Sequence, residues 1–217
     1  MQQAKIALVF NGVWSHYAFA KAEKYKRLVE LVYVHDLATT DLNTYEALMI
    51  PFQSDHKTIA DSSKKIAEFL GSGKKVFVEG DSSAGWLDAT WEDRPVNNYW
   101  WVEHPQQPPV SKTNFEHPVY HGLTPRHACW HTHGAYTKVP DHAEVLQVNG
   151  EQEVITWETG YYGGKLLVTT LDPIVEHGVQ QITHLDHYVD QLIEWLIGIK
   201  PEGAFVIDSH DYGVSWT

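Results

Sequence analysis

The chain has 217 residues, and its hydrophobic content of 43% is typical of a globular protein with a substantial core. Acidic residues outnumber basic ones by 28 to 16, and the net charge of −12 argues against a nucleic-acid backbone or an anionic membrane as partner. Because the chain has no long apolar run, no secretory leader and a single cysteine, Cys129, we expect one cytoplasmic domain over 1–217 without a disulfide framework.

The first 80 residues alternate strand-like and helix-like segments. Apolar runs predict strands at 5–10, 28–34, 45–51 and 76–78. Ser15 is expected to cap a helix over 16–27, and Ser54 or Asp55 to cap a helix that ends at Gly71. This alternation predicts a mostly parallel sheet covered by helices.

The strand at 76–78 ends in a short polar turn, Gly80-Asp81-Ser82-Ser83-Ala84-Gly85. In an open α/β sheet, ligands bind beyond the carboxyl ends of the strands, so this turn is a candidate site with Trp86 beside it. An ordinary turn, whose Asp and Ser side chains bond their own backbone, is the alternative. We expect the strand in the sheet centre, flanked by the first and third strands, with Asn11, Gln53 and Ser54 converging on the same pocket.

The alternation stops in the segment 86–125, which we interpret as a long insertion with a short strand over 99–103. A set of tryptophans in and after this insertion is suited to stacking against sugar rings: Trp86, Trp91, Trp100, Trp101 and Trp130. For most of them we favour a place in a satellite core or an oligomer contact.

The second half of the chain predicts further strands. One is expected within 127–136, and a hairpin joins 144–148 to 153–159 through Asn149-Gly150. A strand over 165–171 precedes an amphipathic helix over 184–197. The tail, 202–217, is interpreted as a weak terminal strand.

Four blocks of the sequence together carry a resemblance to a known family. They are Tyr45–Pro51, Ile66–Gly85, His117–Leu123 and Gly163–Pro173, the last followed by a helix that ends in Trp195-Leu196. In this order and spacing they resemble the class I glutamine amidotransferase-like superfamily, and within it the ThuA-like (trehalose-utilisation) branch. The resemblance implies an α/β fold, a flavodoxin-like three-layer sandwich with a mostly parallel central sheet, and a pocket at the carboxyl ends of the strands.

One departure from the family affects the chemistry. Glutaminases of this superfamily carry a nucleophilic cysteine in the turn that is Gly80–Gly85 here, and this turn has none. Cys129 is expected to pack as a small apolar residue. Glutaminase activity is therefore not expected.

A serine could replace the missing cysteine only if a base activates it. Ser82 or Ser83, with Asp81 beside them, is the candidate nucleophile, and the resemblance offers His177 as base in the loop after Leu171. Asp172 or Glu176 would orient the base, Ser83 would contact the ligand, and backbone N–H groups near Gln53-Ser54 would form an oxyanion hole. A degenerate pocket without catalysis is the simpler alternative.

A histidine cluster follows the insertion, with His127, His131 and His133 in the pattern H-x3-H-x-H. In a strand, His131 and His133 would share one face and, with a carboxylate, could hold zinc or another divalent metal. Chance clustering is the alternative, because the chain has 14 histidines. No other cofactor is expected.

These observations favour a protein that binds or acts on a small polar metabolite, with a carbohydrate as one candidate. If it is an enzyme, we expect a hydrolase or a sugar-modifying enzyme. The competing hypothesis is a non-catalytic interaction module that uses the same fold for oligomerisation, and in either case we expect a homo-oligomer.

Overall fold

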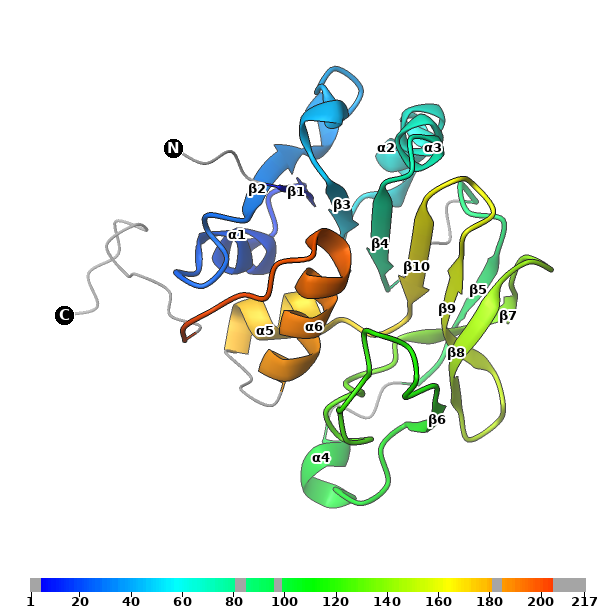
Figure 1. The fold of residues 1–217 in the computed structure, drawn as a ribbon. Helices are drawn as coiled ribbons and strands as arrows, with labels where there is room; N and C mark the ends of the chain where they lie inside the picture. The colour runs from blue at the N-terminus through cyan, green and yellow to red at the C-terminus, as the bar shows by residue number, and fades with distance from the viewer. Residues whose placement is uncertain (1–4, 81–84, 96–98, 181–184, 205–217) are drawn as a thin grey trace.

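The computed structural model describes residues 5–80, 85–95, 99–180 and 185–204, with the side chains of 178–180 excepted. Asp81, Ser82, Ser83 and most of the predicted tail strand lie outside these residues. The described residues form a 10-stranded mixed sheet with helices beside it (Figure 1).

The strands and helices follow one another along the chain as in Figure 1. The strands are β1 (Ile6–Phe10), β2 (Val29–Tyr33), β3 (Ala47–Ile50), β4 (Lys75–Glu79), β5 (Thr90–Asp93), β6 (Val110–Thr113), β7 (Gly134–Lys138), β8 (Glu144–Asn149), β9 (Val154–Thr159) and β10 (Lys165–Thr169). The α-helices are α1 (Trp14–Lys21), α2 (His56–Ala60), α3 (Ser63–Gly71), α4 (Trp100–Glu103), α5 (Pro173–Gln180) and α6 (Asp186–Ile197). Two short 3-10 helices, η1 (Val34–Asp36) and η2 (Leu42–Thr44), lie between β2 and β3.

One half of the sheet is parallel, in the order β2-β1-β3-β4-β10. This half confirms the alternation of strands and helices predicted from the first 80 residues. The expected neighbours of β4 were β1 and β3, and this is wrong on one side, because β10 pairs with β4 and β1 lies beyond β3. A strand from the end of the chain takes the central place, and the order of elements along the sequence does not fix such long-range pairing.

The other half is antiparallel. β9 pairs with β10, β8 and β7 both pair with β9, and β6 and β5 extend the sheet further. The predicted hairpin is confirmed as β8 and β9, whose short connection fits only antiparallel neighbours. The sheet is therefore parallel only in part, which the expectation of a mostly parallel sheet did not include.

The insertion has more structure than predicted. It contains β5, α4 and β6, and the segment expected to be a short strand over 99–103 is largely the helix α4. In this segment Trp100 is buried while Trp101, Val102 and Glu103 are exposed. A single buried side chain within one turn suits a helix, whereas a strand would alternate buried and exposed positions.

Two helix starts show how the local sequence acts. Asp55 caps α2, with its carboxylate accepting bonds from the N–H groups of Lys57 and Thr58. The helix predicted to run on to Gly71 is divided into α2 and α3. Ser15 is not a cap, because α1 begins at Trp14 and buries Ser15 in its first turn.

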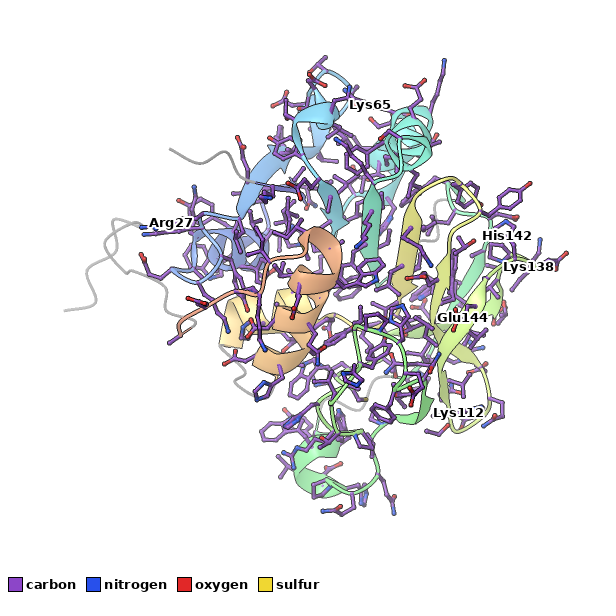
Figure 2. All side chains as sticks on the ribbon, viewed as in Figure 1. Arg27, Lys65, Lys112, Lys138, His142 and Glu144 are labelled. Atoms are coloured by element: carbon purple, nitrogen blue, oxygen red, sulfur yellow. The ribbon has the colours of Figure 1, made fainter. Side chains whose placement is uncertain are left out.

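The core lies on both faces of the parallel half. Alternate side chains of β4 show this, since Phe77 packs with α1, α5 and α6 and Val78 packs with α2 and α3. Burial on both faces explains why these strands are continuous apolar runs in the sequence. Charged side chains such as Lys112 and Lys138 lie on the outside of the antiparallel half (Figure 2). None of the described helices is long and apolar enough to cross a membrane.

Candidate functional site

The pocket is predicted where the parallel strands end, and two of the segments there are tied together. Asn11, directly after β1, donates a hydrogen bond from Nδ2 to the backbone carbonyl of Gln53 at 3.0 Å. A second bond ties the loop after β3 to helix α1, because the carbonyl of Phe52 lies 2.7 Å from His16 Nε2. Burial lowers the pKa of His16, so this ring is neutral near pH 7 and donates its proton to the carbonyl. The expectation that Asn11 and Gln53 meet is confirmed.

The loop after β3 has an unusual backbone. Gln53 adopts a φ of 65°, which is uncommon for a residue with a side chain. Strained residues of this kind concentrate at binding and catalytic sites. Beside it, the hydroxyl of Ser54 is buried and has no hydrogen-bond partner among the described residues.

The turn after β4 can be followed only at its first residue. Gly80 donates its N–H to the carbonyl of Thr169 at 2.7 Å. Its φ is 70°, and a Cβ here would lie 2.0 Å from Cδ2 of Phe52. Because glycine has no Cβ, the Phe52 ring can pack directly against the backbone at the end of β4. The roles predicted for Asp81, Ser82 and Ser83 remain predictions.

A buried carboxyl group that the sequence analysis missed holds this region together. Glu79, the last residue of β4, is fully buried and accepts hydrogen bonds from the N–H of Phe52 at 3.2 Å and the N–H of Ile174 at 2.9 Å. Burial raises the pKa of Glu79 well above its usual value, and the nearby charge of Asp172 raises it further. The signal in the sequence was a lone glutamate at the end of an apolar strand.

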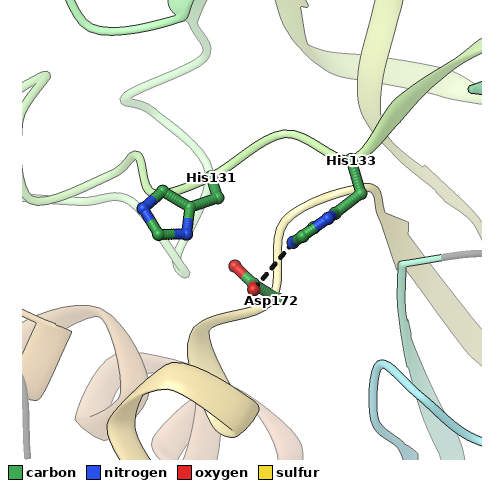
Figure 3. Close-up of side chains that lie close together, drawn as sticks. All are labelled: His131, His133 and Asp172. Atoms are coloured by element: carbon green, nitrogen blue, oxygen red, sulfur yellow. Dashed lines mark hydrogen bonds and ion pairs between the residues drawn. The ribbon is translucent and has the colours of Figure 1, made fainter. Parts of the chain in front are cut away.

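Asp172 and His133 form the centre of the candidate site. Oδ2 of Asp172 lies 2.8 Å from Nε2 of His133 (Figure 3). Asp172 is only 1% exposed, and its Oδ1 has no hydrogen-bond partner among the described residues. Since a buried carboxylate oxygen without a partner is costly, this atom is a candidate contact for a ligand.

The segment that carries the histidines is brought to Asp172 by backbone pairing. Thr132 forms an isolated antiparallel bridge with Leu171, and the N–H of His133 donates to the carbonyl of Thr170 at 3.3 Å. The strand predicted within 127–136 begins only at Gly134, as β7. His131 and His133 nevertheless converge, because they flank the bridge residue and side chains alternate at period two.

His131 completes the group. Ligand atoms of His131, His133 and Asp172 all lie within 4.8 Å of one another, and Figure 3 shows the His133 ring directed at the carboxylate and one nitrogen of the His131 ring facing it. Glu176 of α5 stands beside them, with Oε1 3.9 Å from Nδ1 of His131. Burial raises the pKa of Glu176, and the charge of Asp172 adds to the effect.

Aromatic rings hold both histidines. His133 stacks on Phe52 with ring centroids 4.1 Å apart, and His131 stacks on Trp130 at 4.6 Å. Trp101 also stacks on Trp130, with ring centroids 6.2 Å apart, and is 37% exposed. A column of aromatic rings therefore runs from the polar group to the surface.

His177 does not join this group as predicted. The segment after β10 is the helix α5 and not a loop, so His177 is turned about 100° from Glu176. Its Nε2 lies 3.1 Å from Asp186 of α6, and its ring meets Tyr25 edge-on. The pairing predicted for His177 with Asp172 or Glu176 is thus replaced, and Asp172 orients His133 instead.

The tryptophans do not form a single cleft. Trp86 and Trp91 pack with the core under α2 and α3, where Trp86 donates to Nδ1 of His56 at 3.1 Å. Trp100 and Trp130 belong to the core on the other face. The interpretation that most of them pack in cores is confirmed, and the predicted contact of Trp86 with a ligand stays a prediction.

With this geometry known, the chain can be compared with known proteins. No family model and no curated protein matches the sequence. A cytoplasmic protein from Salmonella typhimurium superposes with a TM-score of 0.58 at 16% identity, over 91% of this chain and 100% of that chain. A ThuA-like protein from Bacteroides uniformis superposes with a TM-score of 0.58 at 14% identity, over 93% of this chain and 94% of that chain. The fold is ThuA-like.

The ThuA-like fold also occurs within larger proteins. A β-galactosidase from Bacillus circulans gives a TM-score of 0.56 at 12% identity, over 92% of this chain and 32% of that chain. At these identities the likeness is one of fold. It confirms the structural resemblance expected from the four sequence blocks.

Two sizeable hollows among the described residues lie away from Asp172. One of about 550 Å³ lies along β6 and β8, and one of about 430 Å³ lies beside Gln191 and Trp195 of α6. We place the candidate site at the smaller polar group, because a buried carboxylate oxygen without a partner is a more specific sign of a ligand than volume.

Cys129 is separate from this chemistry. It is 1% exposed, and burial raises the pKa of its thiol to about 12. A thiol with so high a pKa is almost entirely protonated near pH 7 and is a poor nucleophile. Its burial confirms that it packs as a small apolar residue.

Proposed function

We propose that this protein binds a small polar metabolite at the carboxyl edge of its parallel strands, in contact with Asp172, His133 and His131. The observation that carries the proposal is the buried Oδ1 of Asp172, which lacks a partner among the described residues while Oδ2 holds His133. A hydroxyl or amine group of a ligand would satisfy this oxygen. The loops at Asn11 and Gln53 would form the far wall of the same site.

A carbohydrate is the ligand class that we favour. Trp101 presents a partly exposed ring at the end of the aromatic column that leads to His131. The flat apolar face of an indole suits the apolar face of a sugar ring, and the polar group below it suits hydroxyls. A β-galactosidase is among the proteins that share the fold, which adds modest support from a likeness of fold alone.

The chemistry that we propose is acid–base chemistry. Asp172 fixes the ring of His133, as a carboxylate does for a histidine that moves protons. Glu176, whose pKa is raised by burial, is a second carboxyl group that holds its proton to a higher pH than an exposed glutamate does. Ser82 and Asp81 stay candidates for a nucleophile and its neighbour, and glutaminase activity is not proposed.

A cytoplasmic location, a homo-oligomer and a single domain over 1–217 also stay proposals.

The test is a binding screen with mono- and disaccharides, measured by isothermal titration calorimetry and ligand-observed NMR. We expect at least one sugar to bind the wild-type protein and binding to fall about tenfold or more in Asp172→Asn. Asp88→Asn, which changes an exposed carboxylate, is the matched control and should bind normally. If Asp172→Asn binds as well as the wild type, the site is wrongly placed.

A second candidate function rests on the surface of α4. Tyr99 is 65% exposed, Val102 is 59% exposed and Trp101 lies between them. Exposed apolar residues that cluster in this way are typical of protein contacts. A dimer in light scattering that dissociates in a Tyr99→Ser/Val102→Ser variant, together with no sugar binding, would favour the interaction module over the binding protein.

A further inference from the structure

The donor set around Asp172 has the composition of a metal site. Two imidazoles and one carboxylate, from His131, His133 and Asp172, have ligand atoms within 4.8 Å of one another (Figure 3). Two histidines and a carboxylate, with positions left open, are a common ligand set for catalytic zinc and non-haem iron. We propose that these three residues bind a divalent transition-metal ion, which deepens the proposed function and rests on it for the identity of the site.

Charge supports a cation here. Asp172 is buried, and among the described residues its carboxylate is paired with His133 and with no lysine or arginine. Glu176, half-buried, stands on the same side of the site. Buried carboxyl groups that gather without a cation are expensive, and a divalent ion would offset that cost directly.

The distances fit coordination after a small adjustment. Metal bonds to imidazole nitrogen and carboxylate oxygen are about 2.0–2.2 Å, so the 2.8 Å between His133 and Asp172 subtends an angle of about 90° at the metal. Such an angle suits two adjacent positions of a five- or six-coordinate ion. A span of up to 4.8 Å exceeds the sum of two bonds by roughly half an ångström, which a small rotation of the His131 ring closes.

The surrounding groups hold the ligands in place. Phe52 stacks on His133 and Trp130 stacks on His131, so neither ring turns freely. Glu79 bonds the backbone of Phe52 on one side and of Ile174 on the other, two residues after Asp172. Metal sites depend on support of this kind as well as on the ligands themselves.

The sequence cluster also contains a histidine that does not belong to the site. The ring of His127 lies 5.6 Å from that of His187 on α6. It is partly exposed, and it is absent from the metal-ligating group among the described residues. His127→Ala is therefore a matched control for His131→Ala and His133→Ala.

The experiment uses the full chain, stripped with a chelator and titrated with zinc chloride and, separately, cobalt chloride. We expect one ion per chain, a melting temperature that rises with added metal, and cobalt d–d absorption typical of mixed nitrogen and oxygen ligands. His133→Ala and Asp172→Asn should weaken binding beyond the roughly 10- to 100-fold caused by loss of a supporting residue. His127→Ala should bind as the wild type does.

Two results would overturn the proposal. The first is no saturable binding of either ion to the wild-type chain, a measurement that does not depend on whether a variant folds. The second is an equal loss of affinity in His127→Ala and His133→Ala. Sugar titrations on the stripped and the loaded chain separate the two proposals, because sugar binding without metal binding leaves the proposed function standing and removes only the metal. Metal binding without any sugar ligand does the reverse.

Discussion

The two halves of the sheet divide the work of folding and of forming the site. In the parallel half, β1, β3, β4 and β10 are buried along nearly their whole length and carry helices on both faces. In the antiparallel half, β5 and β6 have four residues each and are largely exposed. Yet this half leads into the loop that brings His131 and His133 to Asp172. The parallel half therefore provides the buried core and the Asp172 carboxylate, whereas the antiparallel half provides His131 and His133.

The largest effects on stability are expected from truncating one buried aromatic side chain in each of the two regions. Phe77→Ala in the parallel half and Trp130→Ala in the antiparallel half both remove a buried aromatic side chain, so each should cost about 3–5 kcal/mol of unfolding free energy. Urea denaturation followed by circular dichroism measures both. A much smaller cost for Trp130→Ala would show that the aromatic region packs loosely and does not fix His131.

The close contact between Gly80 and the Phe52 ring gives the next largest effect. Gly80→Ala places a Cβ 2.0 Å from the Phe52 ring at a φ of 70°, and we expect it to cost about 2–4 kcal/mol through steric crowding and backbone strain. Gly73→Ala is the matched control, because Gly73 also has a positive φ but nothing within 4 Å of its Cβ position. It should cost only about 1–2 kcal/mol. Equal losses in thermal melts would mean that Phe52 moves aside easily.

Glu79 links the end of β4 to both the Phe52 loop and α5, and its raised pKa makes stability depend on pH. The folded chain keeps this proton to a higher pH than the unfolded chain, so the stabilisation is full below the usual glutamate pKa and is lost as pH rises through the folded value. Each unit of the shift is worth about 1.4 kcal/mol. The unfolding free energy of the wild type should therefore fall relative to that of Glu79→Gln as the pH rises above the usual glutamate pKa. Parallel curves for the two proteins would contradict the assignment.

The smallest effect on stability is expected at the outer end of the aromatic column. Trp101 is partly exposed on α4, so Trp101→Ala should change the unfolding free energy by less than about 1 kcal/mol. The same change should weaken sugar binding if the column is a stacking surface. A large loss of stability would instead make Trp101 part of the satellite core.

Much of the parallel half could be predicted because its signals are local. Burial on two faces gives continuous apolar runs such as Val76–Val78, and Asp55 and Gly71 mark a helix start and a helix end. The antiparallel half was harder, because α4 is a short aromatic segment whose helical turn is fixed by the packing of Trp100 against Trp130.

The candidate site was predicted only in its parts. Asp172, Glu176, His131 and His133 were each recognised as polar residues near strand ends or in a cluster, and Asn11 and Gln53 were expected to meet. The predicted pairing of these residues was wrong. His177 lies beside Asp186, and Asp172 is hydrogen-bonded to His133 instead. Glu79 was overlooked because a single glutamate at a strand end does not reveal whether it is buried.

The sequence by itself determined the strand and helix pattern of the first 80 residues, the β8–β9 hairpin and the absence of a cysteine from the turn after β4, because these depend on neighbouring residues in the chain. The tertiary structure decided that β10 lies beside β4, that the segment of His131 and His133 pairs with the end of β10, and that Glu79 is buried between two backbone donors. Each of these depends on contacts between residues far apart in the sequence. Such contacts are selected by the packing of the whole core and not by local propensity.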